Sequence, residues 1–372
     1  MMPKMNIEQA IGSLIMTGLR GASLDDPQCR ADVALLKAHH IKGVILFDTH
    51  LPTALPTQES AGGMRNIVSE SQLRTLTDDL RNELGDDLIV AIDQEGGRVN
   101  RLGLFGDAGV SDQLSARMQG AMSERQLRAT IQPVAQALHD AGVNLTFAPC
   151  VDLETNPDNP IIAGKNRALG RDPVRVASSA STIISAYHAC GVRCCLKHFP
   201  GHGSSTTDTH LGLADITDSY HDDEQRVYRM MIESMHAGRV PEFGVMTGHL
   251  MHRRVDARLA ASLSPAHTQG VLRNILGFDG VVVTDSLDMG AIRSRHDPGS
   301  ATVLSILAGA DIALDGYNAP ITPQHPERPH PAPVMHGAIL DAAQGGLIEE
   351  SRIMESVFRR ARWGEESPDN SG

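Results

Sequence analysis

The feature that most constrains the fold of this chain is a sustained alternation of short apolar runs with segments of helical spacing. The eight runs, rich in Val, Ile and Leu, lie at residues 13–19, 43–47, 88–93, 143–149, 192–198, 243–249, 280–285 and 310–314. Helix-period segments at 30–39, 71–84, 111–141, 173–190, 223–238, 265–276, 300–309 and 333–362 separate and follow them. Strands buried on both faces read as continuous apolar runs, and such alternation is typical of a parallel sheet covered by helices.

These eight units predict an α/β protein with a single (β/α)8 TIM-type barrel over residues 1–364 and a flexible tail at 365–372. The region 111–141 is long enough for two helices. A doubly wound open sheet is the alternative, but it calls for a glycine-rich phosphate fingerprint after the first strand, and none follows residue 19. The proline-rich stretch 319–333 is predicted to be a surface loop.

Composition excludes several classes of function. The 33 Lys and Arg residues against 45 Asp and Glu give a net charge of −12, and nothing concentrates a basic face, so we expect neither nucleic-acid nor membrane partners. The first 16 residues lack a basic segment followed by a long apolar run, which favours a cytoplasmic location. The 5 cysteines include no CxxC pair and are expected to be reduced, buried side chains.

Polar residues gather at the predicted carboxyl ends of the strands, where barrel enzymes place their chemistry. The third run ends in Asp93-Gln94-Glu95, the fourth is followed by Asp152 and Arg167, the fifth ends in Lys197-His198, the sixth in His249 and the seventh in Asp285. A barrel rim carries this density of charge only where the groups are paired or functional.

The loop after the fifth strand contains Asp208-Thr209-His210 among Gly, Ser and Thr residues. In an Asp-x-His arrangement the carboxylate accepts a hydrogen bond from one ring nitrogen and raises the basicity of the other. Such a pair suits general acid/base chemistry near neutral pH, although the tripeptide alone is a weak signal.

The segment 197–203 (KHFPGHG) followed by Asp208-Thr209-His210 resembles the signature of glycoside hydrolase family 3, and in particular its bacterial β-N-acetylglucosaminidase branch. The segment 92–101 (IDQEGGRVNR), the segment 156–160 (NPDNP) and the segment 278–287 (FDGVVVTDSL) resemble further blocks of that family in the same order.

The resemblance implies a role for each matching residue. Asp285 corresponds to the nucleophile, His210 to the acid/base, and Asp208 to its partner. The residues that correspond to those holding the sugar are Asp93, Arg101, Arg167, Lys197 and His198. A retaining glycosidase needs a nucleophile on one side of the anomeric carbon and a proton donor on the other, and here a His–Asp pair replaces the usual second carboxylate.

Three departures from the family pattern bear on these assignments. The loop 161–170 is about two residues longer than is usual before the sugar-binding arginine, so Arg167 is the least secure assignment. Thr209 stands where Ser is usual. His252-Arg253-Arg254 is more basic than expected, which indicates either a solvated loop or a contact with an anionic group.

No second α/β sandwich domain is expected, which favours the compact acetylglucosaminidase branch over two-domain β-glucosidases.

We therefore expect a retaining exo-β-N-acetylglucosaminidase that acts on small sugar substrates, including peptidoglycan fragments, without cofactor or metal. The sequence leaves the oligomeric state open and favours a monomer. A β-glucosidase or an N-acetylglucosaminide phosphorylase on the same scaffold remains an alternative, because a neutral His lets phosphate approach where a carboxylate would repel it. Other classes are a sugar-binding protein without catalysis and a metal-dependent barrel hydrolase. The candidate ligands for the latter are His198, His202, His210, His249 and Asp285, although 198 and 202 flank Pro-Gly rather than a helix.

Overall fold

The computed structural model describes residues 5–49, 64–103, 105–106, 108–209, 212–318 and 329–363. The predicted tail at 365–372, His210 and most of the proline-rich stretch lie outside these residues. The eight predicted strands are all present, as β1 (Ile15–Thr17), β2 (Gly43–Ile45), β3 (Ile89–Ile92), β4 (Leu145–Thr146), β5 (Arg193–Phe199), β7 (Gly244–Thr247), β9 (Val282–Thr284) and β10 (Ala313–Asp315).

These strands form one parallel sheet in the order β10-β1-β2-β3-β4-β5-β7-β9. Strand β1 pairs with β10, with Ile15 opposite Ala313, which joins the two ends of the chain. A parallel bridge between Val283 and Ile312 brings the two remaining edges together and closes the barrel. Closure removes the exposed strand edges that an open sheet would leave, so the doubly wound alternative is wrong.

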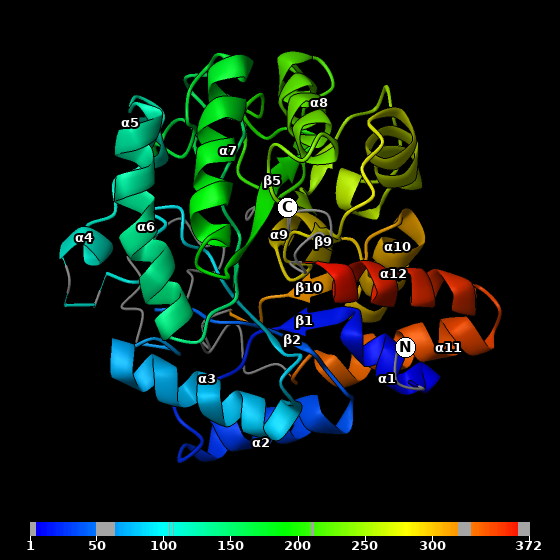
Figure 1. Cartoon of the computed structure of the whole chain (residues 1–372). Coiled ribbons are helices and arrows are strands. Elements are labelled where there is room, and N and C mark those ends of the chain that lie inside the picture. The colour runs from blue at the N-terminus through cyan, green and yellow to red at the C-terminus, as the bar shows by residue number, and fades with distance from the viewer. Residues whose placement is uncertain are drawn as a thin grey trace.

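Helices surround the barrel on its outside (Figure 1). They are α1 (Ile7–Ser13), α2 (Pro27–Ala38), α3 (Glu70–Leu84), α4 (Ala108–Ser111), α5 (Ala116–Gln119), α6 (Glu124–Asp140), α7 (Pro173–His188), α8 (Asp223–His236), η1 (Ala261–Leu263), η2 (Ala266–Ile275), α9 (Gly290–Arg293), α10 (Pro298–Ala308), α11 (Ala332–Gln344) and α12 (Glu350–Arg362). The segment 111–141 holds two of them, α5 and α6, as predicted. The helix predicted at 265–276 is η2, a π-helix.

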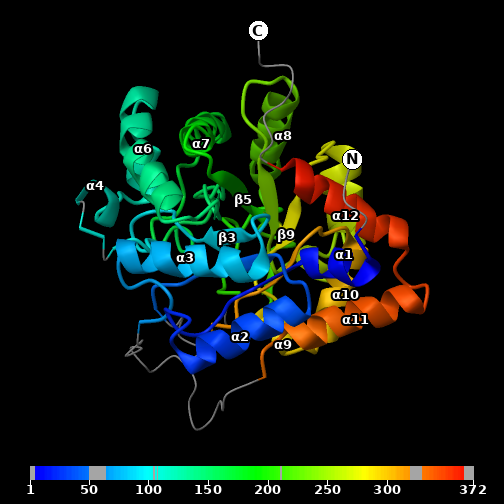
Figure 2. The same ribbon diagram turned by 60° about the horizontal axis from the view of Figure 1, so that its bottom comes forward.

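Sequence signals fix several helix starts. Asp26, Asp172 and Asp297 each accept a hydrogen bond from the first turn of a helix whose first residue is proline, which combines a side-chain cap with a preset backbone angle. The first helix α1 lies beside α11 and α12, so the two ends of the described chain meet on one side of the barrel (Figure 2). Of the helices described, none is both long and apolar enough to span a membrane.

The core has two layers, as expected for a barrel covered by helices. The layer between strands and helices is the larger one, and a separate cluster fills the barrel interior with Met16, Phe47, Phe147, Met246 and other side chains. Trp363, which follows α12, belongs to the interior cluster and is fully buried. Its ring fills the space beside Gly244, where a Cβ would lie 2.7 Å from the indole. The C-terminal segment therefore closes the amino-terminal end of the barrel and leaves the other end for chemistry.

A second, two-stranded sheet was not predicted. Strands β6 (Ala214–Asp215) and β8 (Leu250–Met251) pair in parallel and join the loop after β5 to the loop after β7. This small sheet stiffens the rim beside the segment that carries Asp208.

Candidate active site

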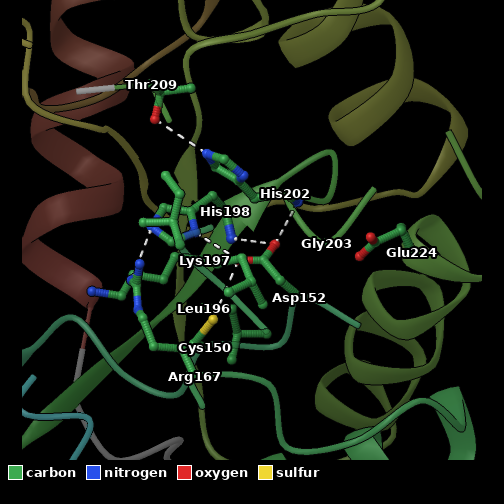
Figure 3. A network of polar contacts seen from close by, with 12 residues as sticks. Cys150, Asp152, Arg167, Leu196, Lys197, His198, His202, Gly203, Thr209 and Glu224 are labelled. Carbon is green, nitrogen blue, oxygen red and sulfur yellow. Dashed lines mark hydrogen bonds and ion pairs between the residues drawn. The ribbon is translucent and has the colours of Figure 1, made fainter. Parts of the chain in front are cut away.

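The carboxyl ends of β3, β4, β5 and β9 bring charged side chains to one rim of the barrel. Asp93 directly follows β3, Lys197 and His198 lie in the last part of β5, and Asp285 directly follows β9. Because parallel strands share a direction, these residues meet at the same end even though they are far apart in the sequence. Figure 3 shows the part of this rim that surrounds His198.

A chain of ion pairs runs through the rim. The Lys197 ammonium lies 2.6 Å from Asp93 Oδ1 and 2.7 Å from Glu95 Oε1. Arg167 donates from Nε to Glu95 Oε2 and from Nη2 to Glu95 Oε1, both at 2.8 Å. This two-pronged geometry fixes the plane of the guanidinium and leaves Arg167 Nη1 outside the pair. The structure thus brings Arg167 into the site despite the longer loop that precedes it.

These pairs keep all three buried groups charged. Burial by itself would raise the pKa of Glu95, but Arg167 and Lys197 hold that pKa far below its usual range. Burial would lower the pKa of Arg167 and of Lys197, and the neighbouring carboxylates raise both instead. Glu95, Arg167 and Lys197 are therefore ionised across the whole range in which an enzyme works.

Asp93 is the member of the network that faces the opening. Its side chain is 19% exposed, against 3% for Lys197 and 1% for Glu95. Arg101 lies 3.8 Å from Asp93 Oδ2 and 3.1 Å from Asp48. A carboxylate held between two cations and open on one side is suited to accept hydrogen bonds from sugar hydroxyls.

His198 is held by a second buried carboxylate. Asp152 Oδ2 lies 2.6 Å from His198 Nδ1, and Asp152 Oδ1 accepts the backbone N–H groups of His198 and His202 at 3.0 and 2.7 Å. Burial would raise the pKa of Asp152, but the contact with His198 lowers it below its usual range. The other ring nitrogen, Nε2, lies 3.5 Å from Arg167 Nη2, so Asp152 orients His198 toward Arg167.

The loop with Asp208 is anchored by His202. Nε2 of His202 lies 3.1 Å from the Thr209 hydroxyl, and the carbonyl of Thr209 accepts the N–H of Ala291. Burial lowers the pKa of His202 to about 4, so this imidazole is neutral at pH 7. Asp208 is half-buried, and His210, the other member of the predicted pair, lies outside the described residues.

Asp285 is set at the end of β9 by backbone contacts. Its N–H donates to the carbonyl of Thr247, and its Oδ1 accepts the N–H of Ser286 at 2.8 Å. The following turn is held by His249, whose Nε2 lies 2.8 Å from the carbonyl oxygen of Ser286. His249 therefore packs under the turn that carries Asp285.

The metal-ligand set considered from the sequence does not form a cluster among the residues described. The one group with ligand atoms close together there is Cys150, Asp152 and His198, within 4.8 Å of one another. Asp152 already accepts from Cys150 and from the backbone, and Arg167 stands beside His198. This arrangement orients His198 through hydrogen bonds.

The basic tripeptide at 252–254 is neutralised locally. Arg253 pairs with Asp215 at 2.7 Å and Arg254 with Asp218 at 3.4 Å, all exposed. Of the two interpretations of this segment, the solvated loop fits these pairs.

Sequence reasoning left Glu95, Asp152 and Asp48 without roles, and it considered His202 only as a candidate metal ligand. Glu95 and Asp152 both lie just after predicted strands. The signal that could have identified Glu95 is its position two residues after Asp93, at the end of the same strand. Nothing in the sequence pattern singled out Asp48, which lies 53 residues before its partner Arg101.

A closed barrel with charged side chains at the carboxyl ends of its strands is the architecture common to TIM-barrel enzymes. The chain belongs to glycoside hydrolase family 3, because the model of the Glycosyl hydrolase family 3 N terminal domain matches residues 6–362. The predicted family and barrel are both confirmed.

Relatives agree with this assignment. The chain is 31% identical over 300 residues to "Beta-hexosaminidase A" of Pseudoalteromonas piscicida, and the match covers 75% of this chain but only 46% of that protein. It is 30% identical over 308 residues to "Beta-hexosaminidase" of Xylella fastidiosa (strain 9a5c), with 81% of this chain and 82% of that protein covered.

Solved structures give the same fold. A family 3 β-N-acetylglucosaminidase from Paenibacillus sp. str. FPU-7 has a TM-score of 0.80 at 29% identity, covering 99% of this chain and 65% of that one. A β-N-acetylhexosaminidase from Beutenbergia cavernae has a TM-score of 0.79 at 26% identity, covering 97% of this chain and 99% of that one.

Proposed function

We propose that this chain is a retaining exo-β-N-acetylglucosaminidase that removes a terminal β-linked N-acetylglucosamine. The observation that carries the proposal is the network Asp93–Lys197–Glu95–Arg167, which offers one outward carboxylate and fixed cations at the same rim of the barrel as Asp285. Relatives and structural neighbours named for N-acetylhexosamine hydrolysis support the substrate.

The chemistry proceeds in two steps. The Asp285 carboxylate attacks the anomeric carbon, the bond to the leaving-group oxygen breaks, and His210 gives that oxygen a proton. Water then attacks the glycosyl–Asp285 ester while His210 takes a proton from it, so the sugar leaves with its original configuration. Asp208 is the proposed partner of His210, since a carboxylate beside an imidazole stabilises the charged form of the ring.

Substrate binding falls to the buried ion pairs. Asp93 accepts hydrogen bonds from sugar hydroxyls, and Arg101, Arg167 and Lys197 donate to hydroxyls or to the acetamido carbonyl. Only 3% of the residues in the chain are aromatic, which favours a polar pocket for one sugar over a long stacking cleft. The proposed substrates are peptidoglycan fragments and the proposed location is the cytoplasm.

Release of p-nitrophenol from the β-N-acetylglucosaminide and the β-glucoside, side by side and with EDTA, tests the substrate and the metal-free mechanism. If only the glucoside were hydrolysed, the proposed N-acetylglucosaminide specificity would be wrong. If EDTA abolished turnover, the proposed metal-free mechanism would be wrong. A fluorinated N-acetylglucosaminyl inactivator followed by mass spectrometry should label the peptide with Asp285. Equal product ratios with and without phosphate would exclude the phosphorylase.

A further inference from the structure

A buried carboxyl group that the reaction does not use lies under the loop that follows β5. Glu224, in the first turn of α8, is 1% exposed (Figure 3). Its Oε2 accepts the N–H of Leu153 at 3.0 Å, and its Oε1 lies 3.2 Å from the hydroxyls of both Thr155 and Ser204. One carboxyl group therefore ties the loop after β4 to the loop after β5.

The loop after β5 is shaped to meet this carboxyl group. A Cβ on Gly201 would lie 2.4 Å from Glu224 Cβ, and one on Gly203 would lie 2.6 Å from Glu224 Oε1. Gly201 also has a φ of +138°, a value that other residues rarely adopt. The two glycines let the backbone approach the carboxyl group closely, so its position and that of the loop depend on each other.

The same loop carries the proposed catalytic pair. Ser204 is four residues before Asp208, and the segment before it is held by Asp152 through the N–H groups of His198 and His202. Glu224 thus contacts Leu153, the residue after the Asp152 that holds His198, and Ser204 at the base of the Asp208 loop. It makes no contact with the reacting atoms.

No Lys, Arg or His among the described residues forms an ion pair with Glu224, and its partners are a backbone N–H and two hydroxyls. The titratable groups packed near it are Asp152 from the loop after β4, Tyr220 from the turn before α8, and Tyr228 from α8 itself. The loop after β5 brings His202, which is neutral at pH 7. Burial first, and then the Asp152 carboxylate, raise the pKa of Glu224 to about 8.

The hydrogen-bond pattern suits a protonated carboxyl group. One oxygen accepts the N–H of Leu153, while the other can donate its proton to the hydroxyl of Thr155 or Ser204. Both hydroxyls can accept as well as donate. A Gln side chain would fill the same roles, with its oxygen at Leu153 and its NH2 at the two hydroxyls.

We propose that Glu224 is a positioning residue that holds the loop carrying Asp208 as a neutral carboxylic acid, and that its ionisation lowers activity. This inference rests on the proposed function, because it assigns the loop a catalytic role. Ionisation places a second negative charge beside Asp152 and turns both hydroxyls into donors, which shifts the loop and loosens the hold on His198.

The test compares Glu224→Gln with Glu224→Ala, and uses Glu124→Gln, an exposed first-turn residue of α6, as the matched control. The substrate is 2,4-dinitrophenyl β-N-acetylglucosaminide, because its leaving group needs no proton and the titration of His210 then drops out of kcat/KM. The wild-type and control proteins should lose about tenfold in kcat/KM from pH 7 to pH 9.

Glu224→Gln should keep at least half of the wild-type kcat/KM at pH 7 and should lack this alkaline decline. Glu224→Ala should have a kcat/KM about tenfold below that of the wild-type protein at pH 7, mainly through kcat, and should also lack the alkaline decline. An unchanged alkaline decline in Glu224→Gln, or a loss as large as in Glu224→Ala, would overturn the inference.

A second measurement separates this inference from the proposed function. A carboxyl group with a raised pKa stabilises the folded state below its unfolded pKa, and this contribution is lost as pH rises through the folded pKa. The melting temperature of the wild-type protein should therefore fall relative to that of Glu224→Gln between pH 5 and pH 8 and then level off. A difference in melting temperature that does not change with pH would show that Glu224 is not a neutral acid, even if the enzyme were fully active. If the difference fell as expected but the wild-type protein were inactive, only the proposed function and the catalytic role of the loop would be overturned.

Discussion

Replacing Glu95 by Gln tests whether the buried ion pairs build the site. The side chain of Glu95 is 1% exposed and makes three charge-assisted contacts of 2.7 to 2.8 Å with Arg167 and Lys197. The amide keeps the shape but removes the charge and turns an NH2 group toward two cations. Lys197 retains Asp93, whereas no other carboxylate among the described residues forms an ion pair with Arg167.

The expected loss of stability follows from the buried Arg167 charge that this substitution leaves without an ion-pair partner. Removing one partner of a buried ion pair costs about 3–5 kcal/mol, because the other charge remains buried. With an unfolding entropy of about 2.1 cal/mol/K per residue, a loss of about 4 kcal/mol lowers the melting temperature of a chain of 372 residues by about 5 °C. Because Arg167 and Lys197 would then be misplaced by a fraction of an ångström or more, kcat/KM should fall about 100-fold.

The pH dependence of this cost has a defined sign. The pKa of Glu95 is depressed in the folded protein, so its contribution is fully present above the pKa of an unfolded Glu and is lost as pH falls below it. The difference in melting temperature between the wild-type protein and Glu95→Gln should be constant from pH 5 to pH 8 and should shrink below about pH 4.5.

Thermal unfolding followed by circular dichroism, with hydrolysis of the aryl N-acetylglucosaminide, measures both effects. Glu83→Gln is the control, because Glu83 makes only an exposed pair with Lys37 and its loss should cost under about 1 kcal/mol. If Glu95→Gln melted within about 1 °C of the wild-type protein, or kept kcat/KM within about threefold, the ion pairs would not organise the site.

Three further substitutions test the proposed roles and the closed end of the barrel. Asp285→Ala should abolish turnover without lowering the melting temperature by more than about 2 °C, and turnover above about 1% of wild type would remove Asp285 as nucleophile. His210→Ala should slow hydrolysis of alkyl glycosides far more than that of the dinitrophenyl glycoside, and equal losses on both would exclude the acid role. Asp311→Ala should lower the free energy of unfolding by about 3–5 kcal/mol, because buried Asp311 pairs with Arg273, Arg352 and Arg359. A free energy from denaturant unfolding within about 1 kcal/mol of the wild-type value would contradict this.

Much of the site was predictable from the sequence because strand ends mark it. Asp93, Lys197 and His198 were placed correctly at the rim, since each directly follows or ends an apolar run. Arg167 could not be placed with the same security, because the loop before it differs in length from the family pattern. Its position follows from Glu95, which lies 72 residues earlier.

The sequence by itself determined the eightfold alternation, the direction of every strand and therefore the end of the barrel at which charged residues meet. Apolar periodicity carries that information locally, because burial of a strand on both faces requires a continuous apolar run. Only the tertiary structure decided which carboxylate pairs with which cation, as in Asp152 with His198 46 residues later and Glu95 with Arg167. It also decided that Glu224 lies beside Asp152. Ion pairing and pKa depend on distance and burial rather than on spacing along the chain, so these choices exist only once the barrel has closed.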